Sequence, residues 1–210
     1  MAGKILVVDD STFIVDGLVA ILKKKGYTTI AAYGGDEALE ILKKETPDII
    51  ILDIMMEPMD GWETLEKIKG NPATTGVPVL MFSAKKITPQ EAENHRINID
   101  DYVAKPVNPK ALIESIEAVL ARRNRLREVV EKAKAAGVSG QIVDEYVSLK
   151  TSCEVDASLL QVLKNSSALG QPDPLTLQEQ ANAIVWIETR LKEQEIRLKE
   201  ITPLVDPSPV

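Results

Sequence analysis

The first part of the chain alternates short apolar runs with longer stretches in which apolar residues recur at helical spacing. The apolar runs are nearly continuous and rich in β-branched residues, which is typical of strands buried on both faces. They occupy residues 4–10, 28–33, 48–53, 77–84 and 100–106. The stretches that predict helices are 11–25, 36–45, 61–69, 89–96 and 109–134. This alternation predicts an α/β fold, (βα)5, with a doubly wound parallel five-stranded sheet.

Beyond about residue 122 the strand pattern ends and the chain predicts only helices. The fifth helix continues past the length that a sheet could cover, and Gly137 interrupts it. Two short helices follow, with Ser139 and Asp156 as expected N-caps. A capping box, Thr176 with Glu179, then opens a long helix. We therefore predict a first domain over residues 1–122, an all-α helical extension over 123–204 and a flexible tail over 205–210.

The long helix carries a heptad pattern that predicts a coiled-coil-like seam. Apolar residues recur every seven positions, with two more three positions later: Leu177, Ile184, Leu191, Leu198, Ile187 and Ile201. Gln180 and Gln194 interrupt the second set. The seam is compatible with a homodimer, and equally with a hairpin inside the chain. In the hairpin, the residues facing the seam would be Ile142, Tyr146, Leu149, Leu160 and Leu163.

Composition narrows the class of protein. The formal net charge is −7, which is a poor match for a surface that must neutralise nucleic-acid phosphates. The single cysteine, Cys153, cannot form an intrachain disulfide, and we expect a buried free thiol in a reducing compartment. No apolar run approaches the roughly 18 residues of a membrane span, and the first residues do not form a signal peptide. We expect a cytoplasmic protein without membrane contact.

Polar residues follow four of the five predicted strands. Asp9 and Asp10 follow the first strand, Asp53 ends the third, Ser83 lies at the end of the fourth and Lys105 at the end of the fifth. The carboxyl ends of parallel strands share one edge of the sheet, where ligands bind in open α/β folds. Converging carboxylates repel one another unless a cation lies between them, and hard oxygen ligands suit Mg²⁺.

These residue types also support phosphoryl chemistry. A carboxylate such as Asp53 can act as a nucleophile toward phosphorus and form an acyl phosphate. The Lys105 ammonium would pair with a phosphoryl oxygen, and the Ser83 hydroxyl would donate a hydrogen bond to another.

Several of these motifs together resemble the receiver domain of two-component response regulators. They are the pair Asp9-Asp10, the segment LDIMMEPMDG at 52–61, FSA at 82–84 and DDYVAKP at 100–106. The resemblance covers roughly residues 3–122 and implies a flavodoxin-like receiver fold. It also implies a sensor histidine kinase as the partner that supplies the phosphoryl group.

The resemblance implies a role for each acidic residue. Asp53 would be the phosphoacceptor. Asp10, Asp53 and the backbone carbonyl of Met55 would ligate Mg²⁺ directly, and Asp9 would act through a metal-bound water.

Three further roles follow from the same resemblance. Ser83 and Lys105 would contact the phosphoryl group. Tyr102 would be the switch aromatic whose rotamer couples to the Ser83 hydroxyl. The peptide bond between Lys105 and Pro106 would be cis, which is uncommon even before proline.

The sequence departs from the family pattern beside the phosphoacceptor. The family commonly has proline four residues after that aspartate, whereas this chain has Glu57 there and Pro58 one position later. A second carboxylate near the site should favour a bound cation and disfavour an unpaired acyl phosphate. Asp60, which precedes Gly61, is predicted to be an N-cap and no ligand.

The leading prediction is a phosphorylation-activated response regulator that signals to a downstream protein partner through contacts of its helical extension. The alternative is a DNA-binding transcriptional response regulator. Against it, residues 136–210 hold 6 basic and 11 acidic residues, and the basic cluster Arg122, Arg123, Arg125 and Arg127 is interpreted as a solvated helix face. A metal-dependent hydrolase would need a general base, and the one histidine, His95, falls in the wrong region. We therefore expect no enzyme activity beyond slow self-dephosphorylation.

Overall fold

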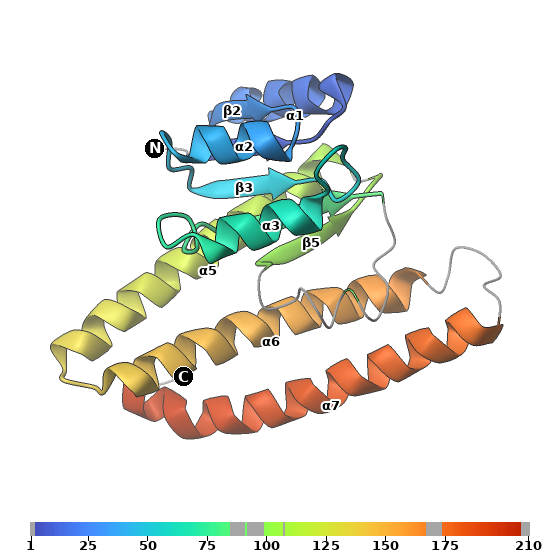
Figure 1. The fold of residues 1–210 in the computed structure, drawn as a ribbon. Helices are drawn as coiled ribbons and strands as arrows, with labels where there is room; N and C mark the ends of the chain where they lie inside the picture. Colours follow the sequence, from blue (N-terminus) through green and yellow to red (C-terminus); the bar gives the residue numbers. More distant parts are fainter. Residues whose placement is uncertain (1–2, 85–90, 92–98, 107, 167–173, 207–210) are drawn as a thin grey trace. The chain divides into compact units, whose positions relative to one another are not determined.

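The computed structural model describes residues 3–84, 91, 99–106, 108–166 and 174–206 (Figure 1). These residues form two compact units, and the division falls inside helix α5 (Pro109–Ala135), between Leu120 and Ala121. Apart from Glu91, the described residues before the division form the sheet unit, and those after it form the helical unit. Within the described ranges, no helix is both long and apolar enough to cross a membrane.

The sheet unit contains the predicted five-stranded parallel sheet, in the order β2-β1-β3-β4-β5. Its strands are β1 (Lys4–Val8), β2 (Thr28–Ala32), β3 (Ile49–Leu52), β4 (Val79–Ser83) and β5 (Asp101–Ala104). From β1 the chain first moves outward to β2 and then returns to form β3 on the other side. The strand order therefore reverses between β1 and β3, which is where open α/β sheets bind their ligands.

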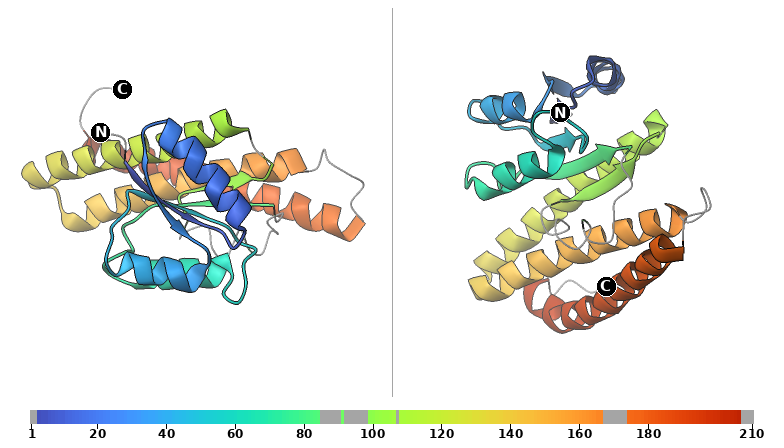
Figure 2. Two further views of the ribbon diagram at one scale, coloured as in Figure 1. Left: turned by 90° about the horizontal axis from the view of Figure 1, so that it is seen from above. Right: turned by 45° about the vertical axis from the view of Figure 1, so that its right-hand side comes forward.

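Helices cover both faces of this sheet, as predicted. The helices α1 (Thr12–Lys24) and α5 lie on one face, and α2 (Gly35–Leu42) and α3 (Gly61–Gly70) lie on the other (Figure 2, left). In β3 all four residues are buried, because alternate side chains point into the two apolar layers. Ile49 and Ile51 pack with α1 and α5 in one core cluster. The helix expected at 89–96 lies outside the described residues.

The helical unit contains the end of α5 together with α6 (Gly140–Ser166) and α7 (Pro174–Val205). The two long helices lie side by side as an antiparallel hairpin (Figures 1 and 2). Near the turn between α5 and α6, all three helices contribute to one apolar core, in which Ala133, Val143, Tyr146, Ile201 and Val205 are buried.

The heptad seam of α7 faces α6 within the same chain. Ile187 and Ile201 are almost fully buried, whereas Leu177 at the start of the pattern is 46% exposed. Of the two arrangements that the sequence left open, the structure therefore shows the hairpin.

The prediction of two short helices before α7 was wrong, because α6 is one helix of 27 residues. Asp156, the expected N-cap of the second helix, lies in the interior of α6 and is fully buried. Aspartate normally favours helix starts, but here its carboxylate forms an ion pair with Arg190 of α7 at 3.0 Å. This tertiary contact outweighs the local preference.

Cys153 lies half-buried on α6. Burial raises the pKa of its thiol to about 11, and the nearby carboxylates of Asp156 and Glu195 add to the rise. The thiolate is the reactive species, so at pH 8 we expect iodoacetamide to alkylate the folded protein about a hundredfold more slowly than a free thiol. Mass spectrometry can follow the reaction. Unfolding in urea should restore the ordinary rate, and equal rates in the two states would contradict the burial of this side chain.

Candidate functional site

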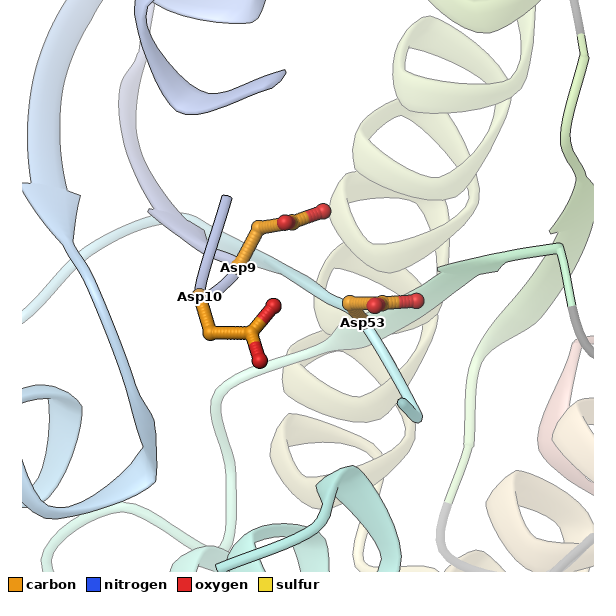
Figure 3. A group of neighbouring side chains, drawn as sticks. All are labelled: Asp9, Asp10 and Asp53. Atoms are coloured by element: carbon orange, nitrogen blue, oxygen red, sulfur yellow. The ribbon is translucent and has the colours of Figure 1, made fainter. Parts of the chain in front are cut away.

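The site is built from the carboxyl ends of two adjacent central strands. Val8 and Leu52, the last residues of β1 and β3, are paired in the strand register. Asp9 and Asp53 therefore leave the sheet side by side, and the Asp53 backbone N–H donates to the carbonyl of Val8 at 2.9 Å. Figure 3 shows the Asp9, Asp10 and Asp53 side chains gathered at this edge. One carboxylate oxygen from each lies within 4.8 Å of the other two.

The three carboxylates differ in their surroundings. Asp9 and Asp53 are only 2% and 6% exposed, whereas Asp10 is exposed to solvent. Asp9 is engaged by two groups, because its Oδ1 accepts from the backbone N–H of Ser11 at 2.9 Å and its Oδ2 accepts from Lys105 Nζ at 2.6 Å. Asp53 Oδ1, by contrast, is buried and accepts no hydrogen bond from the described residues.

Lys105 is the cation that the sheet brings to this cluster. It follows β5, and its backbone N–H donates to the carbonyl of Ser83 at 2.8 Å. Its ammonium nitrogen lies 3.4 Å from Asp53 Oδ1, which is close enough for an ion pair although the geometry is not that of a hydrogen bond. Among the described residues one ammonium faces three carboxylates, so this part of the site carries an excess of negative charge that a further cation would neutralise.

Ser83 and Tyr102 are buried at the β4–β5 side of the same edge. The register pairs Leu52 with Met81 and Ser83 with Ala104, so the Ser83 position lies beyond that of Asp53 along the sheet. Ser83 is fully buried and Tyr102 is 3% exposed. The sequence predicted Asp9, Asp10, Asp53, Ser83 and Lys105 for one sheet edge. The structure brings carboxylate oxygens of the three aspartates within 4.8 Å of one another and places Lys105 in ion-pair distance of Asp9 and Asp53.

The loop after Asp53 borders an open depression of about 460 Å³. Its lining residues are Asp10, Ile54, Met55, Met56, Glu57 and Asp60. The Met55 side chain is 59% exposed, and the Glu57–Pro58 and Lys105–Pro106 peptide bonds are both cis. Glu57, which the sequence marked only as a departure from the family pattern, thus shares a depression with a carboxylate of the cluster.

Asp60 occupies the position predicted for it. It is the N-cap of α3, and its side chain accepts from the backbone N–H of Glu63 at 2.8 Å. A capped helix start therefore lies directly beside the acidic cluster.

Comparison with known proteins gives two family matches along the chain. The model described as response regulator receiver domain matches residues 5–117, more than half of the chain. The model described as Metanogen output domain 2 matches residues 122–209.

Similar solved structures match the first part of the chain. The response regulator receiver domain protein (CheY-like) from Methanospirillum hungatei JF-1 is 29% identical, covers 60% of this chain and 98% of its own, and has a TM-score of 0.56. The chemotaxis protein CheY4 of Vibrio cholerae is 28% identical, covers 57% of this chain and 99% of its own, and has a TM-score of 0.54. The N-terminal domain of a response regulator receiver protein from Methanoculleus marisnigri JR1 is 54% identical, with coverages of 58% and 98% and a TM-score of 0.49.

Proposed function

Since this chain belongs to the response regulator receiver family, we propose that it accepts a phosphoryl group on Asp53 from a sensor histidine kinase. The observation that carries the proposal is the Asp53 carboxylate itself. It ends a central strand, it is 6% exposed, and its Oδ1 accepts no hydrogen bond from the described residues although Lys105 lies 3.4 Å away. A carboxylate at the end of a strand, beside an ammonium group that can pair with a phosphoryl oxygen, is suited to accept a phosphoryl group.

The transfer is a displacement at phosphorus. An Asp53 carboxylate oxygen forms the new P–O bond while the P–N bond of the kinase phosphohistidine breaks. The electron pair of that bond stays on the imidazole nitrogen, so the ring, protonated on its other nitrogen, leaves as neutral histidine. The Lys105 ammonium can then exchange its contact with Asp53 for one with a phosphoryl oxygen, and the Ser83 hydroxyl donates to a second oxygen.

The acidic cluster fits a magnesium ion. Asp10 and Asp53 hold the carboxylate oxygens that the described residues leave available, whereas both Asp9 oxygens already have protein partners. We propose Asp10, Asp53 and the backbone carbonyl of Met55 as direct ligands, with Asp9 acting through a water. When bound, Mg²⁺ would neutralise charge on the cluster and on the incoming phosphoryl oxygens.

We propose that the helical extension is the output and that it acts by binding a downstream protein. The matched family model carries the description of an output domain, this part of the chain is strand-free among its described residues, and residues 136–210 hold 6 basic and 11 acidic residues. Ser83 and Tyr102 are the proposed switch residues, because both are buried, Ser83 at the carboxyl end of β4 and Tyr102 in β5 three residues before Lys105. A homodimer formed through the same helices is compatible with this output.

The transcriptional alternative gains no support from the described helices. Arg122, from the basic cluster on α5, forms an ion pair with Glu154 at 2.9 Å and is only 13% exposed, so it is not available to a phosphate backbone. The groups described around Asp53 are carboxylates and one ammonium, which suit a phosphoacceptor with at most slow self-dephosphorylation and not a turnover enzyme.

A labelling experiment with the full chain tests this function. We expect incubation with phosphoramidate and Mg²⁺ to add one phosphoryl group, detected by intact-mass spectrometry and removed by hydroxylamine, which cleaves acyl phosphates. Excess chelator should prevent the labelling. A chain that stays unlabelled by the small donor, and by any phosphorylated kinase supplied to it, would refute the proposal.

A further inference from the structure

The Asp53 peptide is held between two backbone neighbours. On one side its N–H donates to the Val8 carbonyl of β1 at 2.9 Å. On the other side its carbonyl faces Gly61, the first residue of α3. The chain between them turns back on itself, since the Gly61 N–H donates to the carbonyl of Ile54 at 2.9 Å.

The approach of Gly61 to Asp53 leaves no room for a side chain. A Cβ on Gly61 would lie 2.0 Å from the Asp53 carbonyl oxygen and 2.7 Å from the Ile54 Cα. Both atoms belong to the backbone, so no rotamer change can relieve the overlap. Gly61 does not have a positive φ, so the lack of space, and not an unusual backbone conformation, accounts for glycine here.

We propose that Gly61 is a positioning residue for phosphoryl transfer: the contact of its Cα with the Asp53 peptide fixes where the Asp53 carboxylate lies relative to Lys105 and Asp10. The inference rests on the proposed function. An added methyl group must move either α3 or the Asp53 peptide by more than about 1 Å, because the Cβ would otherwise lie 2.0 Å from the Asp53 carbonyl oxygen. A displacement of that size in a reacting group costs on the order of a hundredfold in rate.

Two other glycines provide matched controls for Gly61→Ala. A Cβ on Gly35 would also meet atoms closely, with Thr64 Oγ1 at 2.2 Å and Met59 Sδ at 3.0 Å, but neither belongs to Asp53. A Cβ on Gly70, at the other end of α3, would meet nothing within 4 Å. Gly35→Ala thus tests crowding against the side chains of Thr64 and Met59, which can rotate away, whereas the crowding at Gly61 is against backbone atoms. Gly70→Ala tests the substitution on the same helix without crowding.

The experiment compares phosphoramidate labelling rates of the four full-length proteins at saturating Mg²⁺. It is run at a temperature where circular dichroism shows each protein to be folded. We expect Gly61→Ala to label ten- to a hundredfold more slowly than wild type, while Gly35→Ala and Gly70→Ala label within about twofold of it. Equal rates for Gly61→Ala and Gly35→Ala, at comparable melting temperatures, would overturn the inference. An unlabelled wild type would instead refute the proposed function.

A second pair of variants keeps the test decisive if Gly61→Ala does not fold. Asp60→Ala removes the cap that holds the first turn of α3, whereas Asp60→Asn removes the same charge but retains a capping side chain. We expect Asp60→Ala to label several-fold more slowly than Asp60→Asn, because a loosened first turn holds the Asp53 peptide less firmly. Equal rates in this pair would count against the positioning role.

Discussion

Replacing Asp53 with asparagine is expected to abolish phosphoryl labelling of the chain. The amide has no anionic oxygen to attack phosphorus, and it removes one of the two carboxylates proposed to ligate Mg²⁺. Asp9 is a poor substitute, because its Oδ2 is engaged by Lys105 at 2.6 Å. Intact-mass spectrometry after incubation with phosphoramidate and Mg²⁺ measures the effect.

Asp48 provides the matched control, because it lies at the opposite end of the same strand. It precedes β3, and its Oδ2 accepts from the backbone N–H of Lys4 at 2.7 Å, a bond that an asparagine oxygen can retain. We expect Asp48→Asn to be labelled like wild type. A label that persists in Asp53→Asn, and that maps to another residue, would show that the phosphoacceptor is misassigned.

Loss of labelling in Asp53→Asn should not reflect unfolding. Three carboxylates lie within 4.8 Å of one another with one ammonium beside them, so removing one charge relieves repulsion. In chelator we therefore expect the variant to melt at a higher temperature than wild type. Added Mg²⁺ should narrow that difference, because it stabilises only the protein that binds it. A lower melting temperature in chelator would mean that the carboxylate cluster is not repulsive.

The sheet and the carboxylate cluster could be predicted because both follow from local patterns. The apolar run Ile49–Leu52 is long enough for one buried strand, and the next residue must then emerge at the carboxyl edge. In a parallel sheet the residues after the strands share one edge, and Asp9 and Asp53 lie side by side because β1 and β3 are neighbours in the strand order. Asp60 was predictable as a cap for the same reason, since capping depends on residues within one turn.

The close contact between Gly61 and the Asp53 carbonyl could not be predicted in this way. The sequence shows Asp60-Gly61 as a turn and helix start, and it explains the glycine only in those terms. That Gly61 lies against the Asp53 carbonyl depends on the path of the loop between them, which no local pattern specifies.

The interior of the helical hairpin was misjudged because its polar residues have distant partners. Asp156 was interpreted as a helix start, yet its partner Arg190 is 34 residues away on α7. Gln180 and Gln194 were interpreted as interruptions of the seam. In the structure Gln194 is 6% exposed, and Gln180 donates to the carbonyl of Leu163. A heptad pattern expects apolar residues at such positions, yet a buried polar residue can specify the register that two helices adopt.

Replacing Arg190 with methionine is expected to destabilise the helical unit by about 3 kcal/mol. The Asp156 carboxylate is fully buried, and the guanidinium Nε lies 3.0 Å from its Oδ2. When the Gln194 side-chain amide is oriented so that its nitrogen and its oxygen both have hydrogen-bond partners, the nitrogen donates to Asp156 Oδ2 at 3.2 Å. Methionine fills much of the space but leaves the buried carboxylate without its cation. Urea unfolding followed by tryptophan fluorescence measures the change in the free energy of unfolding. The probe is Trp186, whose ring centroid lies 5.7 Å from the Arg190 guanidinium carbon, and Trp62 is replaced by phenylalanine so that Trp186 alone reports.

The same ion pair predicts that replacing Asp156 and replacing Arg190 destabilise the helical unit by different amounts. The Arg190 side chain is 30% exposed and can turn toward water when its partner is neutralised, so Asp156→Asn should cost less than Arg190→Met. The double variant Asp156→Leu with Arg190→Met should recover most of the loss, because it removes the buried charge altogether.

Arg197→Met is the matched control on α7. Arg197 donates to both oxygens of Glu145, at 2.7 and 3.0 Å, but the two side chains are 48% and 39% exposed. The hydrogen bonds from this arginine lower the pKa of the Glu145 carboxyl, but an exposed ion pair of this kind contributes little to the stability of a fold. We expect its loss to shift the urea midpoint only slightly. If Arg190→Met shifts the midpoint no more than Arg197→Met does, the buried pair does not stabilise the hairpin, and the register must then depend on the apolar contacts of Ile187 and Ile201 alone.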